Sequence, residues 1–353
     1  MKYLKHIILL LMLAASTPSE AQLVVKAGDA ESLLEAIDKA NVHNADSLSK
    51  RFFVLIPNGV YDLGERTLTP ILGHNIALVG ESMEGVIIKN APKVEDEGIG
   101  KTATLLNRGW NTYVQDLTLQ NALDYYHSGA AGRAVCWQDK GHRAIFKHVK
   151  FLSYQDTYYS HSEECQHYFE DCEIHGTIDF ICGAGDVYFN HCTIVTEKSI
   201  ESHSSTNVIA APRTSTTDWG YVFESCTIRN NVSDFYLARG WHSHPRCTWL
   251  RTTLINPERL GASRFDPQSI RTHETVFFEY GTMDRNGNNI TPATNVVNFR
   301  GNDGQHEAET IISEKEAAKF TLKNIFPKWH PDKKTRKLEK QCARMKQKYL
   351  LSE

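Results

Sequence analysis

Three short stretches decide the fold: "EDCEIHG" at 170–176, "NHCTIVT" at 190–196 and "ESCTIRN" at 224–230. Each alternates polar and apolar residues with a period of two, which is typical of a half-buried β-strand. In each stretch a cysteine is followed two residues later by isoleucine, so the same inward positions recur after 20 and then 34 residues. Recurrence at this spacing predicts stacked units that bury their apolar faces against one another.

The same pattern extends in both directions along the chain. It recurs in "QDLTLQN" (115–121), "KHVKFLS" (147–153) and "LRTTLIN" (250–256). Earlier apolar runs at 52–57, 75–80, 85–90 and 103–107 fit the same interpretation. Many short strands with corner turns and few helices between them predict an all-β chain that forms a right-handed parallel β-helix.

An open coil of strands needs covering at its ends. Residues 29–42 place Leu33, Leu34 and Ile37 on one helical face, and Ser32 with Glu35 matches the capping-box pattern of a helix start. The stretch 313–326 opens with the same pattern and predicts a second helix. No Pro- or Gly-rich linker divides the chain, so we expect one domain at 22–327, followed by a basic, helical C-terminal tail at 328–353.

The first 21 residues match an export signal. Two lysines precede an apolar run at 7–15, and small residues flank a cleavage position that places the mature start near Gln22. The run is too short to span a bilayer, and no later segment is long enough. We therefore expect an exported protein that does not span the membrane, located in the periplasm or on the outer surface of a bacterium, or secreted.

Charge is unevenly distributed along the chain. The tail at 328–353 carries nine Lys or Arg against three Asp or Glu, which leaves residues 22–327 at roughly −10. A body of that charge argues against a nucleic-acid partner, because nucleic-acid binding needs clustered cations. We expect the basic tail to be a solvated helix face rather than a binding element.

Eight cysteines in an exported chain admit two interpretations. Cys172, Cys192 and Cys226 occupy one inward position of the repeat, so they are expected to stack inside the coil as small hydrophobic residues. A ladder of disulfides is the alternative.

A carboxylate interrupts the apolar run "HGTIDFICGAG" at 175–185. Asp156 lies 23 residues before Asp179, and Arg133 lies 23 residues before Asp156. One coil apart in sequence is one strand apart in space, about 4.8 Å. The spacing predicts a row of Arg133, Asp156 and Asp179 on adjacent coils, with Gln155 beside it.

Two carboxylates so close cannot both be charged without cost. One pKa rises and gives a proton donor, while the other group stays ionised as a base or nucleophile. Alternatively, each Asp is a corner residue that accepts a hydrogen bond from its own turn. The two in coil register, with an amide and an arginine available, favour a catalytic pair.

Several ordered motifs resemble the pectin methylesterases. They are "YQDTYY" (154–159), "GTIDFICG" (176–183), "YLARGW" (236–241), "GRAVCWQ" (132–138) and "IPNGVYD" (56–62). The resemblance extends to about residue 327. It implies a parallel β-helix that hydrolyses methyl esters of galacturonate units in pectin or a related polysaccharide.

The resemblance also implies a role for each motif residue. Asp179 corresponds to the nucleophile, Asp156 to the acid and base, and Gln155 to an oxyanion donor. Arg239 would hydrogen-bond Asp179 and hold it charged. Trp241, Tyr159 and Phe180 take positions that line the sugar groove, although any of them could serve packing alone. No metal or other cofactor is implied, and we expect a monomer.

Arg133 stands where the family has its first oxyanion glutamine. It could donate to the developing negative charge, form an ion pair with Asp156 and spoil it as an acid, or select a substrate with an extra carboxylate. A catalytically weakened or non-catalytic pectin-binding protein is therefore the alternative. A glycosidase or lyase is a third and weaker possibility, because neither Gly-His-Gly nor Arg-Ile-Lys occurs in the chain.

Overall fold

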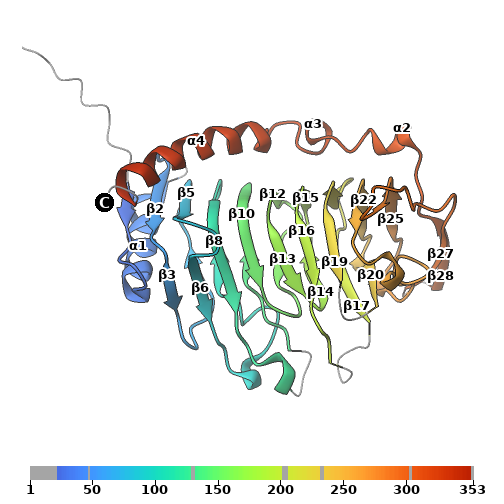
Figure 1. Cartoon of the computed structure of the whole chain (residues 1–353), viewed down its shortest axis with the longest axis horizontal. Helices are drawn as coiled ribbons and strands as arrows, with labels where there is room; N and C mark the ends of the chain where they lie inside the picture. Colours follow the sequence, from blue (N-terminus) through green and yellow to red (C-terminus); the bar gives the residue numbers. More distant parts are fainter. Residues whose placement is uncertain are drawn as a thin grey trace, which may run out of the picture.

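A computed structural model describes residues 22–46, 48–128, 132–200, 206–230, 234–301 and 304–350. The expected export signal at 1–21 lies outside these residues. The described chain winds into parallel coils whose strands form one curled sheet of 17 strands and a second sheet of seven strands (Figure 1). This architecture confirms the predicted parallel β-helix.

The seven-stranded sheet contains β4 (Thr69–Ile71), β7 (Leu105–Asn107), β9 (Trp137–Asp139), β11 (Tyr158–Ser160), β14 (Ile178–Gly183), β17 (Asn207–Pro212) and β20 (Phe235–Ala238). The large sheet contains β1 (Gln22–Val24), β2 (Phe52–Ile56), β3 (Gly59–Asp62), β5 (Ile76–Gly80), β6 (Val86–Asn90), β8 (Tyr113–Asn121), β10 (Ala144–Leu152), β12 (Gln166–Glu170), β13 (Glu173–Gly176), β15 (Asp186–Asn190), β16 (Thr193–Thr196), β18 (Tyr221–Glu224), β19 (Thr227–Asn230), β22 (Arg246–Leu250), β23 (Thr253–Leu254), β25 (Val276–Tyr280) and β26 (Met283–Asp284). The remaining strands pair as β21 (Trp241–Ser243) with β24 (Ile270–Thr272) and β27 (Val296–Gly301) with β28 (Gly304–Glu309).

The repeat sets the register of the large sheet. Ile174 pairs with Ile194, Ile194 with Ile228, and Ile228 with Leu254. The predicted alignment of inward positions is therefore confirmed. The cysteines that precede these isoleucines are buried free thiols inside the coil, as the stacking interpretation expects.

A ladder of stacked aromatic rings fills the interior. Phe146, Phe169, Phe189, Phe223 and Trp249 occupy one position on five successive coils, with ring centroids 4.4, 4.6, 4.4 and 3.8 Å apart. All five rings are fully buried. Burial of such large apolar faces supplies the main driving force for stacking the coils.

Each coil turns a corner within the large sheet at a residue with positive φ. These corner residues are Asp116, His148, Asp171, His191, Ser225 and Arg251, with φ between 51° and 54°. Each immediately precedes an inward residue of the repeat. A left-handed residue at this point bends the strand path, so the sheet curls around the core.

Both ends of the coil are covered. The N-terminal helix α1 (Ala30–His43) buries Leu33, Leu34 and Ile37 in the core. Its N-cap is Asp29, which accepts a hydrogen bond from the Ser32 backbone, so the expected capping box at Ser32 is wrong. The helix begins three residues earlier than that pattern implies, and the Asp29 carboxylate already caps it. At the far end, the hairpin β27–β28 packs Phe299 into the core.

The C-terminal segment crosses the outer face of the large sheet (Figure 1). It contains α2 (Glu314–Ala317), α3 (Leu322–Ile325) and α4 (Pro331–Tyr349), and the capping box of α2 at Ser313 and Glu316 is confirmed. Leu338, Cys342 and Met345 on α4 are buried against outward residues of the strands. Only the other face of this basic helix is solvated, so the tail is an integral layer of the fold.

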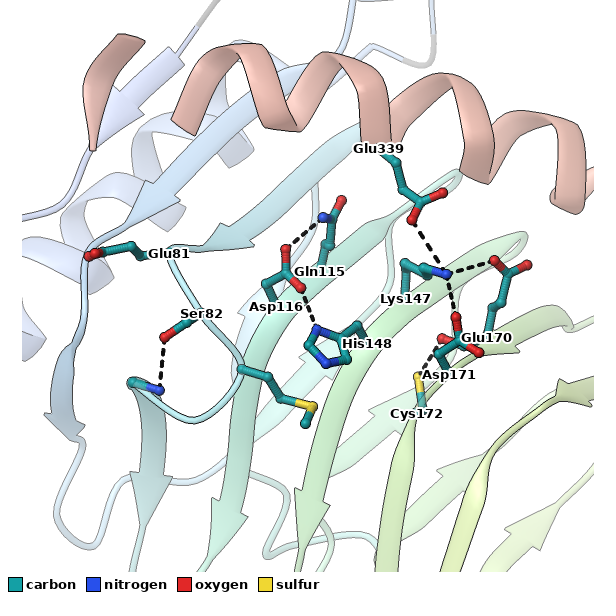
Figure 2. Close-up of polar contacts among 12 residues, drawn as sticks. Glu81, Ser82, Gln115, Asp116, Lys147, His148, Glu170, Asp171, Cys172 and Glu339 are labelled. Atoms are coloured by element: carbon teal, nitrogen blue, oxygen red, sulfur yellow. Dashed lines mark hydrogen bonds and ion pairs between the residues drawn. The ribbon is translucent and has the colours of Figure 1, made fainter. Parts of the chain in front are cut away.

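Two lysines, one on α4 and one on β10 beneath it, form ion pairs with corner residues of the large sheet. Lys346 on α4 pairs with Asp116. Lys147 on β10 contacts both Glu339 of α4 and Asp171 (Figure 2). Within the residues that the structure covers, no helix has the length and apolar character needed to cross a bilayer.

Candidate active site

The two carboxylates lie side by side on neighbouring coils. Strands β11 and β14 pair in register, with Tyr158 opposite Ile181 and Tyr159 opposite Cys182. The same offset of 23 residues places Asp156 opposite Asp179, about 4.8 Å away across the sheet. The predicted neighbourhood of these two residues is thus present.

Arg133 does not continue that row as expected. It forms a β-bridge with Gln155, and Trp137 further along pairs with Tyr158. The offset to the next coil is therefore 22 residues at the bridge and 21 in the strand, rather than 23. This slip in register moves Arg133 beside Gln155 instead of Asp156.

Both carboxylates sit on unusual backbone. The φ angle is 60° at Asp156 and 51° at Asp179, a left-handed conformation that few non-glycine residues adopt. The register between β14 and β17 also shifts between Ile178 and Ile181, so one extra residue is accommodated at Asp179 and Phe180. A bulge of this kind re-aims side chains and is common beside active sites.

Arg239 approaches Asp179 from two coils away. It follows β20 directly, where Ala238 pairs with Ala210 of β17. Its Nε donates to Asp179 Oδ1 at 2.8 Å, and its Nη2 donates to Oδ2. This two-point contact fixes the orientation of the carboxylate and compensates its charge.

Among the described residues, no cation makes a comparable contact with Asp156. Its side chain is 4% exposed, and the Cys182 thiol lies 3.8 Å from its Oδ1. Burial and the adjacent Asp179 charge raise the pKa of Asp156 well above its ordinary value, although Arg133 and Arg239 oppose the shift. The raised pKa favours the protonated form of Asp156 beside Asp179.

Glu97 holds the guanidinium of Arg133. Arg133 Nε and Nη2 donate to the two carboxylate oxygens of Glu97 at 3.1 and 3.2 Å, and the Arg133 backbone N–H also donates to Glu97. Of the three outcomes considered for Arg133, an ion pair with Asp156 is thus not what the structure shows. Gln155 is half-buried, and its backbone carbonyl accepts from Ala134 at 2.9 Å.

The three expected sugar-lining aromatics separate into two groups. Tyr159 and Trp241 pack together on the outer face of the seven-stranded sheet, with ring centroids 6.2 Å apart and Arg213 over the Trp241 ring at 5.5 Å. Phe180 is instead fully buried in the interior core. Its ring has no face available to a sugar, which agrees with the packing alternative rather than the groove position.

A pocket lined in part by Tyr154, two residues before Asp156, was not apparent in the sequence. It has a volume of about 440 Å³, and its lining includes Tyr154, which directly precedes Gln155, together with Tyr125, Tyr126, His175 and Glu197. The rings of Tyr125 and Tyr154 are stacked with centroids 4.7 Å apart. No sequence pattern identified this pocket, because its walls come from the ends of four different coils.

A buried polar cluster was also missed. Asp139, Cys165 and His167 place their ligand-type atoms within 4.8 Å of one another. The Asp139 carboxylate, however, already accepts hydrogen bonds from Trp137 Nε1 at 2.8 Å, from the Gly141 backbone at 2.7 Å and from Asn107. These donors occupy the carboxylate, so the cluster fits an internal polar network better than a metal centre.

Comparison with known proteins agrees with the fold. "Probable pectinesterase 50" of Arabidopsis thaliana is 27% identical over 71% of this chain and 72% of its own length. "Putative pectinesterase/pectinesterase inhibitor 26" of the same plant is 24% identical, and this chain spans only 27% of its length. Among solved structures, pectin methylesterase PemA from Erwinia chrysanthemi has a TM-score of 0.65 at 22% identity, covering 88% of this chain and 98% of its own. The carrot enzyme has a TM-score of 0.67 at 20% identity, covering 88% and 95%.

The family described as Pectinesterase matches residues 23–327, which are nearly all of the predicted β-helix domain. With this match over most of its length, the chain belongs to the pectinesterase family.

Proposed function

We propose that this protein hydrolyses methyl esters of galacturonate units in pectin or a related polysaccharide. One observation carries the proposal: a buried Asp156 with a raised pKa lies next to Asp179, which Arg239 orients through two hydrogen bonds. Family membership supports the same reaction. A related structure described as a pectin methylesterase in complex with a hexasaccharide supports an oligosaccharide substrate.

In the proposed mechanism, an Asp179 oxygen attacks the carbonyl carbon of the methyl ester. The proton held by Asp156 passes to the methoxy oxygen as its bond to carbon breaks, and methanol leaves. The resulting anhydride between Asp179 and galacturonate is then attacked by water. Asp156 takes one proton from that water, and the bond between Asp179 and the acyl carbon breaks, which regenerates the Asp179 carboxylate and the protonated Asp156. The free galacturonic acid departs and loses its own proton to solvent.

The negative charge that develops on the carbonyl oxygen needs a donor. We propose that Gln155, the residue directly before Asp156, supplies one, and a single donor of this kind is worth about 10²–10³ in rate. Arg133 is the second candidate, with its guanidinium oriented by Glu97. The alternative function is pectin binding without turnover, and it is motivated by this Glu97 contact, because a guanidinium engaged by Glu97 could be held away from the substrate.

A methanol-release assay distinguishes the two functions. Purified protein is incubated with highly esterified and with branched pectins, alongside an Asp179→Asn variant that keeps the shape of the side chain. The proposal predicts methanol from the native chain and none above background from the variant. Saturable pectin binding without methanol from either protein would establish the binding function instead. We further propose that the protein acts outside the cytoplasm, which N-terminal sequencing of the mature protein from a cell fraction can test.

A further inference from the structure

An exposed tryptophan stands at a corner remote from the carboxylates. Trp110 follows β7 and is 52% exposed. The imidazoles of His74 and His142 flank it, with centroids 5.8 and 5.7 Å from its ring, so the three rings form a row across successive coils. An indole held in place by neighbours on both sides and open to solvent suits the apolar face of a sugar ring.

A pocket opens beside this tryptophan. It has a volume of about 240 Å³ and is lined by Trp110, Lys140, His142, Arg143, Ser162 and Glu164. Typical sites for drug-sized ligands are larger, so this volume suits a single sugar ring. His142 Nδ1 lies 2.6 Å from the Glu164 backbone carbonyl, which assigns the proton to Nδ1 and leaves Nε2 as the acceptor of this ring.

Cations gather at the same corner. Asn107 and Asp139 are register partners, so Arg108 and Lys140, which follow them, lie on adjacent coils about 4.8 Å apart. Both are exposed, and among the described residues neither forms an ion pair. Glu164 is the acidic side chain in the pocket lining, so cations outnumber it. Residues 22–327 carry a net charge of roughly −10, so a local excess of positive charge is unusual in this part of the chain.

The corner is distinct from the catalytic neighbourhood. Trp110 lies beyond the end of β7, whereas Asp179 lies near the start of β14, three coils further along. From strand rise and coil spacing, the two are roughly 20 Å apart. A ligand that reaches both must therefore be several sugar units long.

We propose that the Trp110 pocket is a second binding site for a uronate residue, with the sugar face on Trp110 and the carboxylate at Lys140, which lines the pocket and lies next to the exposed Arg108 of the adjacent coil. The proposal rests on the proposed function for the identity of the polymer. On a pectin chain the site would hold an unesterified unit while a methylated unit lies at Asp179. The protein would thus act preferentially on long, partly de-esterified chains.

Binding can be measured independently of turnover. Calorimetric titration with a fully de-esterified oligogalacturonate would compare the native chain with Trp110→Ala, Lys140→Gln and the matched control Lys315→Gln on α2. We expect roughly tenfold weaker binding for Trp110→Ala, about threefold for Lys140→Gln, and no change for the control. Added salt should weaken the native interaction, because a uronate carboxylate on surface cations is screened.

Kinetics supply the second readout. Trp110→Ala should raise KM for polymeric pectin while leaving kcat unchanged, and it should not alter turnover of a short esterified oligomer that cannot span both sites. Unaltered oligogalacturonate binding in Trp110→Ala would overturn the proposal. Equal affinity for a neutral galactose oligomer would overturn the carboxylate assignment. Oligogalacturonate binding that depends on Trp110 in a protein that releases no methanol would sink the proposed function and retain this site.

Discussion

Two rows of aspartates on this β-helix share a backbone conformation and differ in their partners. Asp116 and Asp171 turn the corner of the large sheet, whereas Asp156 directly precedes β11 and Asp179 lies in β14 of the seven-stranded sheet. All four have φ between 51° and 60°. The residue type and the local geometry therefore do not separate structural from catalytic aspartates.

The two rows of aspartates differ in how the charge of each carboxylate is compensated. Asp116 accepts from His148 Nδ1 at 2.6 Å, and Asp171 accepts from Lys147 at 2.6 Å (Figure 2). Asp116 also accepts from Lys346. Burial alone would raise the pKa of Asp116, but the hydrogen bonds from His148 and Lys346 outweigh it and lower that pKa. The corner carboxylates Asp116 and Asp171 are thus each paired with a cation.

On the seven-stranded sheet, Arg239 forms its ion pair with only one carboxylate of the Asp156–Asp179 pair. Arg239 binds Asp179 at two points, and Asp156 is left with a thiol neighbour and a raised pKa. A buried carboxyl without its own cation is a liability for stability. Its presence next to a paired carboxylate is what makes this row a candidate for acid–base chemistry.

The largest expected effect separates the two rows directly. Asp156→Asn removes the proposed acid and should lower the rate of methanol release about 10²–10⁴-fold. Asp116→Asn, the matched change in the other row, should leave kcat near the native value. A similar loss in both variants, measured at saturating pectin, would show that the comparison does not identify the working carboxylate.

The second-largest effect is expected from replacing an arginine that binds a carboxylate, either beside Asp179 or at the corner of the large sheet. Arg239→Met leaves Asp179 without its two hydrogen bonds and should reduce kcat about 10²-fold or more. Arg251→Met is the control, because Arg251 makes a similar two-point contact with Glu224 at the corner of the large sheet. Activity that survives Arg239→Met would contradict an orienting role for this arginine.

Stability should change in opposite directions in the two rows. The pKa of Asp116 is depressed on folding, so its contribution is present above the ordinary value of 3.8 and is lost as pH falls through the folded pKa. The pKa of Asp156 is raised, so ionisation of this group costs stability as pH rises. In urea unfolding at pH 7, Asp116→Asn should lower the free energy of unfolding by about 1–3 kcal/mol, whereas Asp156→Asn should raise it. The same sign for both changes would refute the charge argument.

The smallest expected effect concerns the Glu97–Arg133 pair. Glu97→Gln removes one charge from a partly exposed contact, and Arg133→Gln restores the amide of the resembled motif. Changes in kcat/KM should stay within about tenfold for either variant. If Arg133 contacts substrate, Glu97→Gln and Arg133→Gln will alter preference among pectins differently; identical behaviour across a pectin panel would place the pair outside the site.

Much of the coil could be predicted because its inward positions repeat in the sequence. The Cys-x-Ile repeat specifies register directly, and Ile174, Ile194 and Ile228 pair as aligned. The alternation of side chains along each strand and the spacing of the coils together also predicted that Asp156 lies next to Asp179. These predictions succeed because apolar burial and hydrogen-bond register act uniformly along a solenoid.

Local irregularities could not be predicted in the same way. Two such irregularities are the shift in register that pairs Arg133 with Gln155 and the bulge at Asp179. Both depend on how adjacent coils pack against each other, and the sequence of a single strand does not contain that information. Phe180 follows a catalytic candidate in sequence, but the bulged strand packs its ring in the core. The sequence did not predict that one face of α4 is buried, because the few apolar residues of this helix are spread among many cationic residues.

The protonation of Asp156 tests the central claim most directly. Carboxyl ¹³C NMR of aspartate-labelled protein, with Asp156→Asn used to assign the resonance, would follow this group across pH in the native chain and in Asp179→Asn. The account predicts that Asp156 titrates well above an ordinary aspartate, and that neutralising Asp179 lowers its pKa without returning it to the ordinary value, because burial remains. Titration of Asp156 at an ordinary pKa in the native protein would contradict the account.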